Sequence, residues 1–131
     1  MRYLLDTNTC IFALKRRDRV IERLKACSPQ DVAVAIITVA ELWFGARKSV
    51  RPQATRREID AFLKPLAVLP FDHDAAEEYA LLRFELQRVG RPIGERDLLI
   101  ASVAAARRLV VVTHNVSEFG RAPGVTVEDW S

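Results

Sequence analysis

The sequence predicts an α/β protein in which helices cover both faces of a parallel sheet. Short runs of β-branched residues alternate along the chain with longer segments whose apolar residues recur at helical spacing. Strands that alternate with helices favour parallel pairing, because each intervening helix carries the chain back across the sheet. Leu109–Thr113 (LVVVT) is the most distinct strand, and Glu95–Arg107 is apolar over most of its surface, which is typical of a buried helix.

Five strands are expected, each a short apolar run ended by a polar or turn-forming residue. Asp6 follows the first strand, and Pro65 and Pro70 bound the third. The expected strands are Tyr3–Leu5, Val32–Ile37, Ala67–Phe71, Leu109–Thr113 and Val125–Val127. Six segments with helical periodicity lie between them. The expected helices are Thr9–Leu14, Arg19–Cys27, Val39–Lys48, Ala54–Leu63, Ala75–Val89 and Glu95–Arg107.

Length and composition favour one domain that spans residues 1–131. Half of the residues are apolar and 28% are charged, which excludes an intrinsically disordered chain. No apolar run reaches the roughly 18 residues that a membrane-spanning helix needs, and we do not expect the N-terminal stretch to act as a secretory signal. Cys10 and Cys27 match no metal-binding spacing, so we expect two free buried thiols and a cytoplasmic protein.

Basic residues are unevenly distributed, although the net charge of +3 is small. Residues 47–57 hold five Lys and Arg and no acid, and residues 15–19 hold four around a single Asp. Several acids, in contrast, stand in or beside apolar runs, where charge is costly. The sequence therefore predicts a basic rim around an acidic centre.

The acids stand where a parallel sheet would bring them to one edge. Asp6, Asn115 and Glu118 follow strands, whereas Glu41 and Asp97 open helices. In such sheets, ligands bind outside the carboxyl ends of the strands. Each residue also has an ordinary explanation. Asp6 can be a helix cap, Glu41 can complete a capping box, and Asp97 can stabilise a helix dipole.

Taken together, the acids predict a divalent-cation site. Crowded carboxylates repel each other unless a cation lies among them. Oxygen ligands without a Cys or His set favour Mg²⁺, with Mn²⁺ as a substitute, over Zn²⁺. A metal of this kind can acidify a water molecule for the hydrolysis of a phosphodiester. Nothing in the sequence pairs His73 with His114, so acid–base chemistry by two histidines has little support.

At these residues the sequence resembles PIN-domain ribonucleases, and among them the VapC-type toxins of bacterial type II toxin–antitoxin pairs. The matching stretches are YLLDTNTCIF, TVAELWFGA, RPIGERDLLIA, VVTHNVSEF and EDWS, in order from residue 3 to residue 131. The resemblance implies a three-layer α/β/α fold with a five-stranded parallel sheet. It also implies a Mg²⁺-dependent endoribonuclease that forms homodimers and is inhibited by a cognate VapB-type antitoxin.

The resemblance also implies roles for individual residues. Three of them match the family's acidic metal-site positions: Asp6, Glu41 and Asp97. Asn115 stands where many relatives have a fourth acid, and its amide oxygen is expected to bind the metal or a metal-bound water in the catalytic site. Glu118 is expected to compensate for the missing charge as a further metal-site residue. The hydroxyls of Thr7 and Thr113 match positions that support the acidic cluster.

The resemblance is closest to the subgroup that cleaves initiator tRNA in its anticodon stem-loop. A single-stranded loop suits a recessed metal site, because its splayed bases can be recognised by the protein. The alternatives are another tRNA or a ribosomal RNA loop, a metal-poor protein that binds RNA or antitoxin, and, remotely, a phospho-receiver-like module. Candidates for RNA phosphate contacts, with a solvated helix face as the alternative, are Lys48, Arg51, Arg56, Arg57, Arg91 and Arg96.

Overall fold

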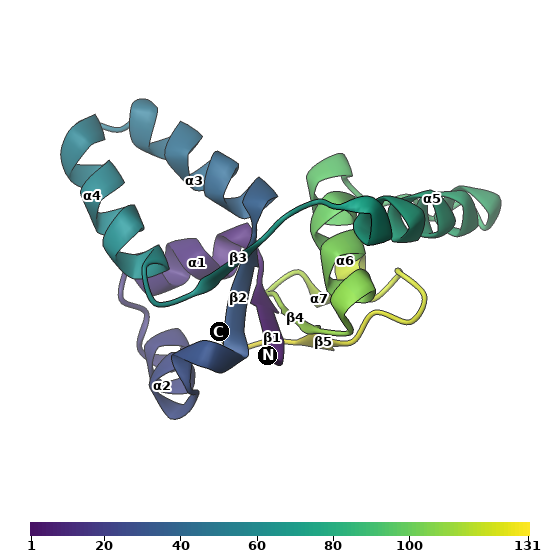
Figure 1. The fold of residues 1–131 in the computed structure, drawn as a ribbon, viewed down its shortest axis with the longest axis horizontal. Coiled ribbons are helices and arrows are strands. Elements are labelled where there is room, and N and C mark those ends of the chain that lie inside the picture. The colour runs from purple at the N-terminus through teal and green to yellow at the C-terminus, as the bar shows by residue number, and fades with distance from the viewer.

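The computed structural model describes residues 1–131 as a five-stranded sheet with helices on both faces (Figure 1), which confirms the predicted fold class. The strands are β1 (Tyr3–Leu5), β2 (Val32–Ala35), β3 (Ala67–Leu69), β4 (Val110–Val112) and β5 (Val127–Glu128). The helices are α1 (Thr7–Leu14), α2 (Asp18–Ala26), α3 (Ile36–Arg47), α4 (Pro52–Leu63), α5 (His73–Arg88), α6 (Glu95–Arg107) and α7 (Val116–Phe119). A short 3-10 helix at Pro29–Asp31 precedes β2.

All strands are parallel, in the order β3-β2-β1-β4-β5, so β1 lies at the centre of the sheet. The chain builds the sheet outward from β1 through β2 and β3, and then returns to add β4 and β5 on the other side. The direction of growth reverses between β1 and β4. Ligands of open α/β sheets bind outside the carboxyl ends of the strands at such a reversal. Asp6 follows β1 and Thr113 follows β4, so both stand at this point.

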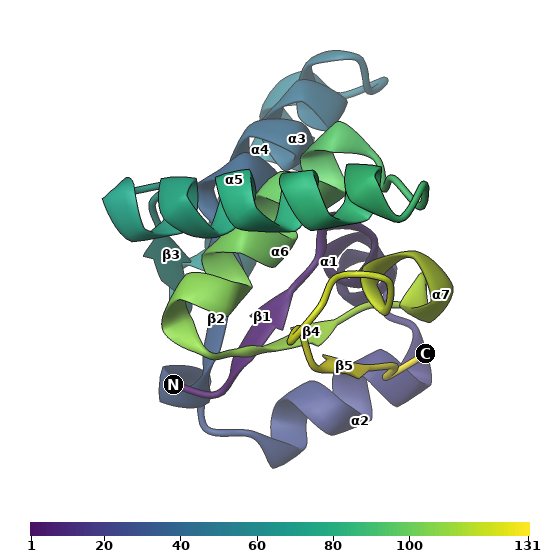
Figure 2. The ribbon, with the colours of Figure 1, turned by 90° about the vertical axis from the view of Figure 1, so that its right-hand side faces the viewer.

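Alternate residues of β1, β2 and β4 face two separate apolar cores. Leu4 and Val111 pack with α5 and α6 on one face, whereas Leu5 and Val112 pack with α1, α3 and α4 on the other. This two-sided burial explains why these three strands are apolar without alternation. Figure 2 shows α5 crossing in front of α6 on the first face. On the second face, α3 and α4 form a helical hairpin that projects beyond the sheet (Figure 1).

The C-terminal residues close the second core. The Trp130 side chain is buried, and its ring meets the Tyr3 ring edge-on with 5.0 Å between the centroids. Its indole N–H donates to a Glu128 carboxylate oxygen at 2.9 Å, so the polar end of this large side chain is satisfied. The closing stretch EDWS is therefore part of the fold.

The expected strand at Val32–Ile37 is too long, because Ile36 and Ile37 form the first turn of α3. A short apolar run suits a buried strand and a buried helix equally, so periodicity could not place this boundary. As a consequence, Glu41 lies in the middle of α3, and the expectation that it opens a helix was wrong. The capping box with Thr38 was also wrong, since Thr38 lies inside the helix.

Smaller differences concern the ends of elements and one cysteine. Helix α7 was not predicted, because four residues are too few to show a helical period. Cys10 is fully buried, and burial raises the pKa of its thiol. Cys27 is only half-buried, contrary to expectation, because it caps the exposed end of α2; both cysteines are free. None of the helices combines the length and the apolar character that crossing a bilayer requires.

Candidate functional site

Asp6 is fixed by the sheet and by the helix that follows it. Its backbone N–H donates to the carbonyl of Val112 on β4 at 3.0 Å, and its Oδ1 accepts from the backbone N–H of Thr9 at 2.8 Å. Asp6 is therefore the N-cap of α1, which is the structural role considered for it as an alternative to metal binding. The cap also places the carboxyl at the carboxyl end of β1, where the side chain is buried with 3% exposure. Burial raises the pKa of Asp6, and the negative charge of Glu41 adds to this effect.

Asp97 lies in the first turn of α6 and is half-buried. Burial raises the pKa of its carboxyl to about 6, with further contributions, in decreasing order, from the charges of Glu118, Asp6 and Glu41. Arg96 opposes this rise. The chain neighbours of Asp6 and Asp97, Thr7 and Arg96, both bond Glu41, and Gly94 bonds Glu118, so four carboxyl groups from distant parts of the sequence lie in one region.

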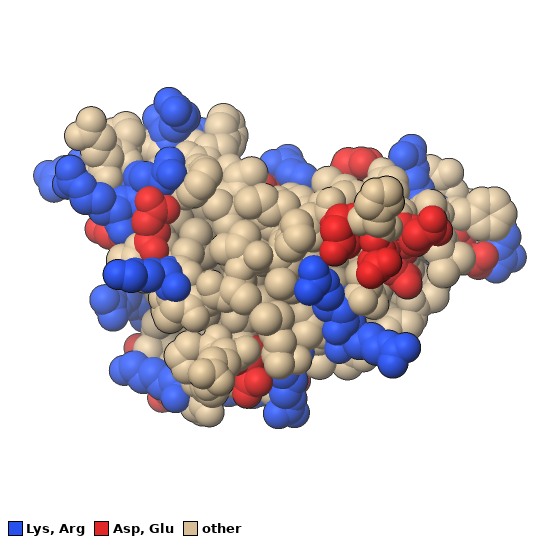
Figure 3. Space-filling model, viewed as in Figure 1, with Lys and Arg blue, Asp and Glu red and all other residues tan.

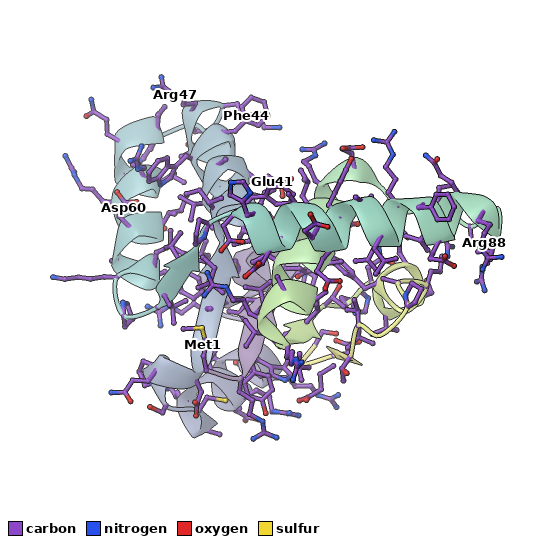
Figure 4. All side chains as sticks on the ribbon, turned by 45° about the vertical axis from the view of Figure 1, so that its right-hand side comes forward. Met1, Glu41, Phe44, Arg47, Asp60 and Arg88 are labelled. Atoms are coloured by element: carbon purple, nitrogen blue, oxygen red, sulfur yellow. The ribbon has the colours of Figure 1, made fainter.

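Glu41 reaches this region from the middle of α3, on the side of the helix that faces α5 and α6 (Figure 4). Its Oε1 accepts a hydrogen bond from the Thr7 hydroxyl at 2.6 Å. Its Oε2 accepts from the Arg96 guanidinium at 3.1 Å. Both oxygens therefore have a partner within the chain. The Thr7 hydroxyl stands where a supporting hydroxyl was expected.

Glu118 and Asn115 form a pair beside Asp97. Glu118 Oε1 accepts from the backbone N–H of Gly94 at 2.6 Å, and its Oε2 accepts from the Asn115 side-chain amide at 2.7 Å. These two bonds hold the pKa of Glu118 below its ordinary value. The Asn115 amide thus contacts Glu118 and carries no charge of its own to the cluster. Of the negative charges that raise the pKa of Asp97, that of Glu118 has the largest effect.

Thr113 links the carboxyl ends of β1 and β4. Its side chain is fully buried, and its hydroxyl oxygen accepts from the backbone N–H of Asn115 at 2.9 Å. A hydrogen bond from Thr113 to Asp6 counteracts part of the rise in the Asp6 pKa. Gly94 was not among the predicted site residues, although its missing side chain matters here. A Cβ at this position would lie 3.3 Å from Glu118 Oε1, tighter than an ordinary contact.

The chemistry of these side chains suits a hard divalent cation. The acids offer only oxygen donors, and their mutual repulsion is relieved by a positive charge among them. The carboxyl groups that the family resemblance assigns to such an ion are those of Asp6, Glu41 and Asp97. In this structure no three acidic, His or Cys side chains lie close enough together to hold a metal ion. Glu41 is held by Thr7 and Arg96 instead, so ion binding requires this side chain to exchange a partner.

The six basic candidates differ in their freedom to bind a phosphate. Arg56 is occupied, because it pairs with Asp60 at 3.0 Å and stacks on the Trp43 ring at 3.7 Å. Arg96 is paired with Glu41. Lys and Arg gather over the α3–α4 hairpin, whereas acidic side chains gather over the start of α5 (Figure 3). The candidates that are exposed and have no ion pair are Lys48, Arg51, Arg57 and Arg91.

Comparison with known proteins identifies close relatives. The chain is 40% identical to the tRNA(fMet)-specific endonuclease VapC of Salmonella typhimurium, over 99% of this chain and 98% of that protein. It is 37% identical to ribonuclease VapC2 of Rickettsia felis, with the same shares covered. These relatives match the chain over nearly its whole length.

Solved structures agree with these sequence matches. The DNA-bound VapBC of Salmonella typhimurium matches with a TM-score of 0.95 and 40% identity, over 100% of this chain and 99% of that one. VapBC2 of Rickettsia felis, bound to a DNA fragment from its promoter, matches with a TM-score of 0.94 and 36% identity over all of both chains. The family model for the PIN domain covers residues 3–124. The chain therefore belongs to the PIN-domain family, among its VapC ribonucleases.

Proposed function

We propose that this protein is the toxin of a type II toxin–antitoxin pair and acts as a metal-dependent endoribonuclease. The observation that supports the proposal is that the chain neighbours of Asp6 and Asp97 both contact Glu41, since the Thr7 hydroxyl donates to it at 2.6 Å and the Arg96 guanidinium at 3.1 Å. Nucleases of the PIN family generally depend on a divalent metal ion. Mg²⁺ is the proposed ion, with Mn²⁺ as a substitute, because all three candidate ligands are carboxylates.

In the proposed mechanism the three carboxylates would bind the ion. Neighbouring residues fix the orientation of the carboxylates through hydrogen bonds. When bound, such a cation polarises a phosphoryl oxygen and acidifies a water molecule. Thr7 fixes the orientation of Glu41, and the α1 N-terminus fixes that of Asp6. Asp97 must lose its proton to serve as a ligand, which its pKa of about 6 permits at neutral pH. Asn115 keeps Glu118 beside Asp97, which maintains the negative potential of the site.

The proposed substrate is initiator tRNA, cut in its anticodon stem-loop. Support comes from the 40% identity to a tRNA(fMet)-specific endonuclease along the whole chain. The free basic residues of the α3–α4 hairpin and Arg91 are proposed to bind RNA phosphates. Another tRNA or a ribosomal RNA loop is the alternative substrate.

The proposed regulator is a VapB-type antitoxin. The closely matching structures from Salmonella typhimurium and Rickettsia felis are VapBC assemblies on DNA, which supports a partner of this class. We also propose that residues 1–131 act as one domain, that the toxin forms a homodimer and that it works in the cytoplasm. Two free thiols agree with a reducing compartment.

The experiment that tests this function is sequencing of 5′-phosphate RNA ends after a brief pulse of expression. The unaltered protein is expected to produce one dominant new end in the anticodon loop of initiator tRNA. Asp6→Ala, expressed at the same level, is the control and should produce none. Dominant ends in another RNA would correct the substrate, and identical ends with both proteins would refute the nuclease assignment.

A further inference from the structure

Arg96 is the one basic side chain that the structure places directly on the acidic cluster. It is the second residue of α6, immediately before Asp97, and it reaches across to α3. Its Nη1 lies 3.1 Å from Glu41 Oε2. The two side chains differ in exposure, since 69% of Arg96 is accessible to solvent but only 21% of Glu41 is. Arg96 therefore covers the cluster from the solvent side.

The contact with Arg96 is incompatible with full access of a cation to Glu41. One Glu41 oxygen is bonded to Thr7 and the other to Arg96, so neither oxygen is free of a partner. A guanidinium beside the carboxylates also repels any second positive charge. Of these two partners, the Thr7 hydroxyl is neutral and can remain. The guanidinium is the partner that a cation would displace.

A displaced Arg96 would still stand at the mouth of the site. Most of its side chain is already in solvent, so the guanidinium can move without disturbing the core. Arginine binds phosphate through two parallel hydrogen bonds, which makes a phosphate a fitting second partner. An RNA phosphate close to the cluster would replace the Glu41 carboxylate as the anionic partner of Arg96.

We propose that Arg96 is a positioning residue with two alternative anionic partners, Glu41 in the metal-free protein and an RNA phosphate in the loaded complex. The proposal rests on the proposed ribonuclease function and adds to it an internal counter-ion. In the free toxin, Arg96 neutralises part of the carboxylate repulsion. In the complex, binding of the metal at Glu41 releases the Arg96 guanidinium, which is then available to bind an RNA phosphate. Metal binding and RNA binding are therefore coupled through Arg96.

The test compares Arg96→Gln with Arg96→Lys, and uses Arg19→Gln as the matched control. Arg19 is an exposed arginine on α2 without an ion pair. Mn²⁺ affinity is measured without RNA, from the free Mn²⁺ signal in electron paramagnetic resonance. KM and kcat are then measured separately on an anticodon stem-loop RNA at saturating Mg²⁺. Thermal unfolding confirms that each variant is folded.

Arg96→Gln is expected to bind Mn²⁺ about threefold to tenfold more tightly, because a competing positive charge a few ångströms away is gone. Its KM for RNA is expected to rise about tenfold, because a charge-assisted phosphate contact is lost. Arg96→Lys should retain most of both properties, and Arg19→Gln should change neither. A residue with a merely structural role would not move the two affinities in opposite directions.

Two results would overturn the proposal. Unchanged or weaker Mn²⁺ binding by Arg96→Gln would show that Arg96 does not compete with the metal. An unchanged KM would show that it does not bind RNA. Failure of the ribonuclease function itself is recognised separately, because the unaltered protein would then bind no Mn²⁺ or cut no RNA.

Discussion

The backbone N–H of Asp6 donates a hydrogen bond to the carbonyl of Val112, 3.0 Å away, so the first carboxylate of the site is tied to the junction of β1 and β4. This bond continues the register of the two central strands, in which Leu5 pairs with Val112. The position of the carboxyl group is therefore determined by the most deeply buried part of the sheet. A site built on such strands is held more rigidly than one built on loops.

Replacing Asp97 by Asn is expected to abolish RNA cleavage and to stabilise the metal-free protein. The asparagine side chain is nearly the same size but uncharged, so the repulsion by Glu118, Asp6 and Glu41 at this position would disappear. The expected gain in the free energy of unfolding at pH 7.5 is about 1 kcal/mol, measured by urea denaturation in EDTA. A less stable Asp97→Asn variant would show that the acids do not repel each other in the folded state.

The stability of the metal-free protein is expected to fall as the pH rises from about 4 to about 6. The pKa of Asp97 is raised from 3.8 to about 6 in the folded state, so the folded protein binds more protons than the unfolded chain in this window. Stability then decreases with rising pH, and the loss for this half-exposed group is on the order of 1 kcal/mol after solvent screening. Urea denaturation between pH 4 and pH 7 in EDTA measures the effect.

Asp97→Asn serves as the control for this pH dependence and should show a flatter profile over the same range. Added Mn²⁺ should restore stability above pH 6, because it binds the deprotonated carboxylate. If the unaltered protein and Asp97→Asn share one profile, Asp97 does not titrate in this window.

Replacing Thr7 by Val is expected to lower kcat about tenfold while the fold remains intact. The Thr7 hydroxyl holds Glu41 Oε1 at 2.6 Å, and a methyl group in its place cannot donate a hydrogen bond. Thr7→Ser keeps the hydroxyl and should recover most of the activity. Single-turnover cleavage of the stem-loop RNA compares the three proteins. Equal rates for the Val and Ser variants would mean that the bond to Glu41 has no catalytic importance.

The salt dependence of RNA binding is expected to separate Arg57 from its neighbour Arg56. Arg57 is exposed and unpaired, whereas Arg56 already contacts Asp60 and Trp43. If Arg57 contacts a phosphate, Arg57→Gln lowers the slope of log K against log salt by about 0.7 to 0.9. Arg56→Gln should leave the slope nearly unchanged. The opposite ranking of the two variants would contradict the assignment of free and occupied side chains.

Most of the fold could be predicted because its signals are local. Val110–Val112 is a β-branched run that ends at the polar Thr113. For the helix Glu95–Arg107, both the first and the last residue were predicted correctly. The start of α3 could not be placed, because Ile36 and Ile37 suit a strand and a helix equally. Helix α7 was not predicted, because a helix of four residues is too short to show helical periodicity.

The acids could be proposed as a group because parallel strands bring their carboxyl ends to one edge. Their partners could not be predicted. Nothing local in the sequence indicates that Arg96 pairs with Glu41, 55 residues away, or that Gly94 donates to Glu118. Such contacts depend on the packing of α3 against α6 and of α7 against α6, which only the three-dimensional structure gives.

The central claim is that Asp6, Glu41 and Asp97 together hold one divalent ion. The most direct test is a crystal of the protein soaked in Mn²⁺, with the ion located by its anomalous scattering. The account predicts an anomalous peak within about 2.0–2.6 Å of oxygens from these carboxylates, with Arg96 withdrawn from Glu41. A peak elsewhere, or no peak in a protein that still cuts RNA, would contradict it.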